Sequence, residues 1–152
     1  IEKPEFTKFS SIMYPKILQQ SLVISLAKLS EDPETEIHGT ISNMLGAFPA
    51  QHYKGLFSKE KTKIRKWPIE YAIHDIVSCK VPQFSILDAS DQGLVFAGQP
   101  LEIDKQASKL LGRDWTSVPH LKLLSKTFDS EDKEKTNEIP NVQDHSKIIR
   151  LK

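Results

Sequence analysis

The chain carries short apolar runs separated by stretches in which apolar residues recur at helical spacing. Leu22–Ala27 is a continuous aliphatic run, which is typical of a strand that is buried on both faces. Phe84–Leu87 and Leu94–Ala97 are two further runs of strand length. Before them, Pro68–Ser78 carries one apolar stripe behind a proline, which predicts an amphipathic helix.

Two more predicted helices follow the third apolar run. Gly98-Gln99-Pro100 has the residues of a turn, with proline at the first helical position. Apolar residues then recur on one helix face, at Ile103, Ala107, Leu110 and Leu111. Gly112 is suited to end this helix, and Pro119–Lys126 predicts another that begins with proline. Because strands alternate with helices, we expect an α/β fold with a layered, mostly parallel sheet and flanking helices.

The length of 152 residues is that of one domain. We expect residues 1–126 to form a single α/β core. Residues 127–145 are charged and nearly free of apolar side chains, which favours a loop or mobile insertion. Residues 146–152 could add a final strand.

Composition and charge exclude several classes of protein. The formal net charge of +1 argues against a general polyanion binder. Cys79 is the single cysteine, so this chain has no intramolecular disulfide, cysteine-rich zinc site or all-cysteine iron–sulfur cluster. A lone cysteine and the lack of a membrane-spanning apolar run are consistent with a cytoplasmic protein. The motifs of serine hydrolases, phosphate-binding loops and dinucleotide-binding folds do not occur.

A local basic run has three explanations. Its basic residues are Lys54, Lys59, Lys61, Lys63, Arg65 and Lys66, and Tyr53, Phe57 and Trp67 are interleaved with them. It could bind single-stranded nucleic acid, form a solvated face with its aromatics inward, or bind an acidic partner protein. The near-neutral charge of the whole chain disfavours nucleic acid.

Three polar residues follow predicted strands, where ligands bind in parallel α/β sheets. Lys28 and Asp88 end two of these strands, and Asp104 lies in the helix after the third. Two carboxylates suit a hard divalent cation, so Asp88 and Asp104 are candidate metal ligands, and either could be a general base. The structural alternatives are that Asp104 complements a helix dipole and that Asp88 caps a turn.

His38 and Asn43 are further candidates for a ligand site. A histidine beside a lysine and an asparagine suits an anionic or carbonyl substrate, and His38 could act in catalysis. The alternative is a surface histidine near a helix cap. No histidine has the spacing of a metal-ligand pair, and we treat the other four as structural or surface residues: His52, His74, His120 and His145.

Four blocks in a fixed order carry a resemblance to a known family. Three of them are Leu22–Leu29, Ile37–Pro49 and Phe84–Ala89. The fourth is a strand, turn and helix that keeps Gly98, Pro100, Ile103, Asp104, Ala107, Leu111 and Gly112. Together with the segment that follows, to Leu124, they resemble the family called domain of unknown function, family 362.

The chain departs from the family pattern at several positions. Ala27 occupies the position of a family proline, and Ser42 that of a lysine. Gln99 replaces an acidic residue, and Glu102 replaces a small one. A longer glycine-rich loop of the family is here reduced to Ser90–Gly93.

The resemblance implies a partner, because family members are often joined to ferredoxin-like iron–sulfur modules. It also implies that further sequence precedes the first strand. We therefore expect a domain that binds a small ligand or a divalent metal and works with a redox partner. Its site residues would be Lys28, His38, Asn43, Asp88 and Asp104. Two alternatives stay open: an acid/base enzyme for a small anionic substrate, and a degenerate, non-catalytic interaction module.

Overall fold

A computed structural model describes residues 1–4, 6–48, 68–135 and 147–150 of the chain. The strands are β1 (Ile24–Lys28), β2 (Ser30–Asp32), β3 (Glu36–His38), β4 (Phe84–Ala89), β5 (Leu94–Gly98) and β6 (Lys147–Arg150). The α-helices are α1 (Lys16–Gln19), α3 (Ile69–Ser78), α4 (Pro100–Ser108) and α5 (Pro119–Lys135). Short 3₁₀ helices are η1 (Ser42–Ala47), η2 (Ser90–Gln92), η3 (Lys109–Leu111) and η4 (Trp115–Ser117). No helix in these ranges is long and apolar enough to cross a bilayer.

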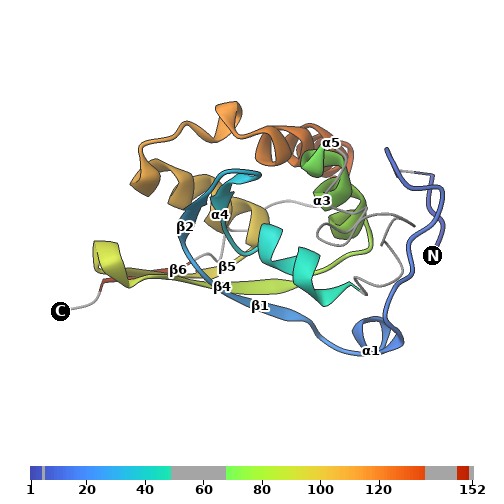
Figure 1. The fold of residues 1–152 in the computed structure, drawn as a ribbon, viewed down its shortest axis with the longest axis horizontal. Helices are drawn as coiled ribbons and strands as arrows, with labels where there is room; N and C mark the ends of the chain where they lie inside the picture. The colour runs from blue at the N-terminus through green and yellow to red at the C-terminus, as the bar shows by residue number, and fades with distance from the viewer. Residues whose placement is uncertain (5, 49–67, 136–146, 151–152) are drawn as a thin grey trace.

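Helices α3, α4 and α5 all lie on one side of a four-stranded sheet (Figure 1). The strand order is β1-β4-β5-β6, while β2 and β3 form a separate hairpin. The α/β fold predicted from the sequence is thus observed. The mostly parallel sheet is not confirmed, because β1–β4 is parallel whereas β4–β5 and β5–β6 are antiparallel.

The short link between β4 and β5 explains the antiparallel pairing. It consists of η2 and Gly93, whose φ of 72° lies in the left-handed region that glycine adopts without strain. A parallel neighbour needs a crossover of a dozen or more residues, so a link this short can only form a hairpin.

Two apolar clusters hold the fold together. In the first, α4 packs on the sheet, and its members are Ala27, Leu29, Leu87, Ala89, Phe96, Ile103 and Ala107. The second lies among the N-terminal segment, η1, α3 and α5, with fully buried Ile12, Ile37, Ile73 and Leu121 among its members. The described helices therefore cover one face of the sheet, and the prediction that the first strand is buried on both faces is wrong. Its residues alternate between exposed and buried.

The helix that begins at Pro119 is longer than predicted. It continues to Lys135, through the first part of the stretch for which we expected a loop. Lysine and glutamate are good helix formers, so a polar segment can extend a helix whose start is packed. The final strand is found as β6, and residues 136–146 lie outside the described residues.

Candidate functional site

Lys28 and Asp88 lie side by side at the carboxyl ends of the parallel strands β1 and β4. The Lys28 ammonium pairs with Asp91 at 3.2 Å, and both side chains are more than half exposed. Asp88 Oδ1 accepts a hydrogen bond from the Ser90 N–H at 2.8 Å. Hydrogen bonds from the Ser90 side chain and backbone lower the pKa of Asp88, and the Lys28 charge adds to them. Asp88 thus caps the turn into η2, as the structural alternative for this residue predicts.

Asp104 is completely buried beneath the segment that leads into η1. Its Oδ1 accepts from the Thr40 N–H and hydroxyl, both at 2.9 Å, and its Oδ2 accepts from the Ile41 N–H at 2.9 Å. Burial outweighs these bonds and raises the pKa of Asp104 to about 6. A Cβ added to Gly39 would lie 2.7 Å from its Cγ, so backbone and carboxyl pack directly together.

Asn43 extends this buried network to the edge of the sheet. Its Nδ2 donates to Ser25 Oγ and to the Leu26 carbonyl, both at 3.2 Å. Ser25 Oγ in turn donates to the Thr40 carbonyl at 2.7 Å. The network therefore ties β1 to η1 and, through Thr40, to α4.

His38 ends β3, opposite Ser30 in the β2–β3 hairpin. In the same hairpin Asp32 accepts N–H bonds from Glu34 and Thr35, at 2.7 and 3.0 Å. No hydrogen bond in the described ranges joins His38 to any of the other four candidates.

The structure thus places four of the five candidates in two groups and leaves His38 apart in the β2–β3 hairpin. Lys28 and Asp88 share the open face of the sheet, whereas Asn43 and Asp104 belong to a network on the helix side. Asp88 and Asp104 are not brought together, because β5 is antiparallel and α4 starts from the opposite end of the sheet. Among the described residues no three His, Cys, Asp or Glu side chains are grouped so that they could hold a metal ion.

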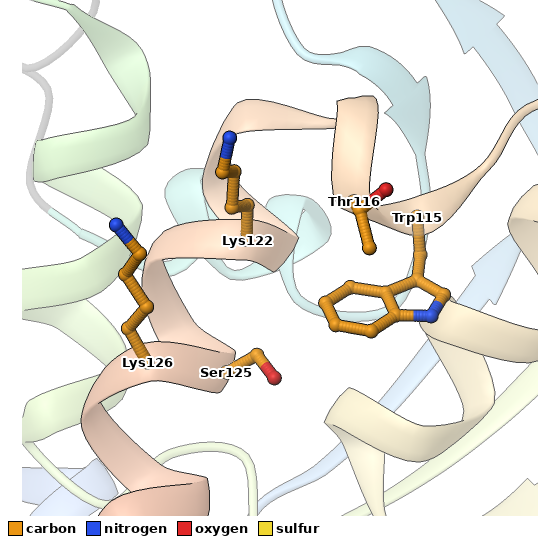
Figure 2. Close-up of a pocket in the computed structure, with 5 residues that line it drawn as sticks. All are labelled: Trp115, Thr116, Lys122, Ser125 and Lys126. Atoms are coloured by element: carbon orange, nitrogen blue, oxygen red, sulfur yellow. The ribbon is translucent and has the colours of Figure 1, made fainter.

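A shallow pocket lies instead between η4 and α5 (Figure 2). It has a volume of about 250 Å³ and is lined by Trp115, Thr116, Lys122, Ser125 and Lys126. A second hollow, of about 200 Å³, adjoins it and is lined by Glu70, Tyr71, Pro119, Lys122, Leu123 and Lys126. Lys122 and Lys126, which we call the lysine pair, line both.

The wall opposite the lysine pair is fixed by local hydrogen bonds. Asp114 Oδ1 accepts from the Thr116 N–H at 2.9 Å and so caps η4. The ammonium of Lys105 lies 4.9 Å from the centre of the Trp115 ring and contacts Glu102 at 3.0 Å. Such a cation–π contact with a half-buried indole restrains the ring. The indole is therefore held in place before any ligand arrives.

Sequence reasoning did not single out this pocket. A signal was present, because Lys122 and Lys126 are four residues apart and share a helix face. The position of Trp115 against that face depends on how η4 packs on α5, which no local pattern reveals.

A histidine network on α3 was also missed. His74 Nδ1 lies 3.0 Å from Asp75 Oδ1, and His74 Nε2 lies 3.0 Å from Thr127 Oγ1. The order hydroxyl, imidazole, carboxylate is that of a hydrolase triad. The Asp75 oxygens, however, also accept N–H bonds from Thr7, Lys8 and Phe9, and neither pocket includes these residues. The arrangement fastens the N-terminal segment to α3, and the buried His74 has a structural role.

His120 is buried as well. Its Nε2 has no hydrogen-bond partner among the described residues, and desolvation lowers its pKa to about 4. It is neutral at pH 7. His52 and His145 lie outside the described residues.

Comparisons with protein-family models, with curated proteins and with solved structures gave no match to this chain. The resemblance to family 362 therefore stays a prediction from the four sequence blocks.

Proposed function

We propose that this chain is a non-catalytic interaction module that binds an acidic segment of a partner protein at the lysine pair. One observation carries the proposal: Lys122 and Lys126 stand between two adjoining hollows, with Trp115 on one side and Tyr71 on the other. Two ammonium groups one helical turn apart match carboxylates spaced along a peptide.

The size of the hollows favours side chains over a whole small molecule. Pockets for drug-sized ligands have volumes of roughly 300–1,000 Å³, whereas these have about 250 and 200 Å³. Each can take one carboxylate side chain. Thr116 and Ser125 add hydroxyls to the first pocket, while Glu70 brings a negative charge to the second. The pocket beside Trp115 is therefore the better site for an acidic residue.

Trp115 makes the site more than a charged surface. An indole that is already held by its neighbours can cover the stem of a bound Glu without a further loss of side-chain entropy.

The other hypotheses have less support from the geometry. A metal or acid/base site at Asp88 and Asp104 requires residues that lie on opposite sides of the sheet. The redox partner implied by the resemblance is compatible with the module, since a ferredoxin-like protein with an acidic surface would be one candidate.

The test is titration with an octaglutamate peptide, followed by calorimetry at about 20 and 300 mM salt. Lys122→Gln/Lys126→Gln should weaken binding about tenfold, because exposed ion pairs contribute up to about 1 kcal/mol each. Trp115→Leu should weaken it as well. The matched control, Lys16→Gln/Lys80→Gln, removes the same charge at exposed lysines outside α5, one in α1 and one in the turn after α3. It should leave the affinity for the peptide nearly unchanged.

Salt should abolish the interaction of the parent protein, because exposed charges are screened at 300 mM. The proposal fails if the peptide does not bind at low salt or if both double variants lose the same affinity. It also fails if an oligothymidylate binds the lysine pair more tightly than the peptide does.

A further inference from the structure

The sheet has a face that no described helix covers. Side chains alternate between the two faces along each strand. Those on the face turned away from the helices form two full rows and one short row. The rows are Lys28–Asp88–Val95–Ile149, Leu26–Ile86–Ala97–Lys147 and Ile24–Phe84. We call this surface the outer face. In Figure 1, α3, α4 and α5 lie on the other side of the sheet.

The outer face is mostly apolar, with three charged residues on its border. Leu26 is 69% exposed, Ile149 54%, Ile24 51% and Phe84 39%. The charged residues are Lys28 and Asp88, at one end of the β1–β4 pair, and Lys147 on the far edge strand. A mostly apolar surface with few charges is typical of interfaces between identical copies of a chain.

We propose that the outer face is the interface of a homodimer, in which two copies of the chain pack sheet against sheet. Three observations favour a second copy as the occupant. The first is the area. From the exposed fractions, the apolar side chains amount to roughly 500 Å², and the three charged side chains bring the face close to the roughly 800 Å² per partner of a standard interface.

The second observation is chemical. Seven of the ten outward side chains are apolar, so the face carries few hydrogen-bonding groups that would specify a different partner. Interfaces between identical copies are more apolar than those of transient complexes. An isologous contact also places the same apolar surface on both sides.

The third observation is the shape of a sheet. Sheets that pack face to face stay within about 30° of each other because both have the same twist. A second copy offers a sheet of identical twist. Pairing of two β1 edges is less favourable, because Asn43 already donates to the Leu26 carbonyl on that edge.

Neighbouring residues of β6 provide a matched pair of variants. Ile148 and Ile149 are 52% and 54% exposed but point to opposite sides of the sheet, since Ile148 pairs with Phe96 and Ile149 with Val95. The measurement is sedimentation velocity from about 1 to 100 µM. The parent should sediment with twice the chain mass of 17.3 kDa. Ile149→Glu and Leu26→Glu should shift the dissociation constant at least tenfold, and Ile148→Glu should leave it within twofold of the parent.

We expect all three variants to fold, because each replaced side chain is exposed. Circular dichroism spectra check this. A parent protein that stays monomeric at 100 µM overturns the proposal and leaves the outer face to another occupant. Equal dissociation by Ile148→Glu and Ile149→Glu also overturns it, because pairing through the β6 edge would be disturbed by both. Neither result bears on the lysine pair, which lies on the helix side.

Discussion

Replacement of Gly39 by alanine tests how the segment before η1 is packed on α4. An ideal Cβ at this position would lie 2.7 Å from both Cγ and Oδ2 of Asp104, and 2.8 Å from Oδ1. The carboxyl group cannot withdraw without losing its bonds to Thr40 and Ile41. We expect Gly39→Ala to destabilise the fold by about 2–4 kcal/mol, from overpacking of about 1–3 kcal/mol and at least one weakened hydrogen bond.

The destabilisation by Gly39→Ala should vanish when the carboxyl group of Asp104 is removed. The backbone at Gly39 is outside the left-handed region, so alanine fits it without strain. In an Asp104→Ala background, Gly39→Ala should be neutral or stabilising by about 0.4–1 kcal/mol, because alanine restricts the unfolded chain. The double-mutant cycle therefore predicts a coupling of about 3 kcal/mol. Asp104→Ala alone should cost about 2–4 kcal/mol, since it leaves buried donors without an acceptor.

The assay is urea denaturation followed by far-ultraviolet circular dichroism at pH 7. Asp104→Asn serves as the control, because it keeps the size of the side chain and should keep the penalty of Gly39→Ala. Equal penalties in the parent and in Asp104→Ala would refute the reasoning. So would a Gly39→Ala protein as stable as the parent.

Two further predictions concern buried carboxylates. Between pH 4 and 6 the folded chain holds a proton on Asp104 that the unfolded chain has released, because its pKa is raised from 3.8 to about 6. Stability should therefore fall by up to about 3 kcal/mol as pH rises through this window. Urea titrations should show that the free energy of unfolding of the parent falls between pH 4 and 6, whereas that of Asp104→Asn should not. A parent protein whose free energy of unfolding does not fall over this range would contradict the prediction. Asp75 anchors the backbone N–H groups of Thr7, Lys8 and Phe9, so Asp75→Ala should release the N-terminal segment. Limited trypsin digestion should then cut after Lys8 well before the core, and an unchanged cleavage pattern would argue against the anchor.

Much of the fold could be predicted from local patterns. The helices that begin near Pro68, Pro100 and Pro119 are found there, because proline suits the first helical turn and an apolar stripe follows each. Gly112 ends its segment with a φ of 69°, as expected of a left-handed cap. The hairpin of β2 and β3 was missed, since three-residue strands carry too short a pattern.

The candidate site was harder to predict because it depends on strand direction. Lys28 and Asp88 converge since β1 and β4 are parallel. The expected meeting of Asp88 with Asp104 assumed a third parallel strand, although Ser90–Gly93 is too short for a crossover. The exposed side of β1 could not be foreseen either. A run of aliphatic residues does not indicate whether a second layer is present.

The pairing of β1 with β4 also bears on how the chain folds. Strand β4, the hairpin turn, β5 and α4 are contiguous in sequence, so their contacts close only short loops. The pairing of β1 with β4 places Ile24 opposite Phe84 and requires a long loop to close first. Because such contacts slow folding, we expect the β4–β5–α4 unit to form early and β1 to join the sheet late. Substitutions in the hairpin should then change the folding rate, whereas those in β1 should chiefly change the unfolding rate.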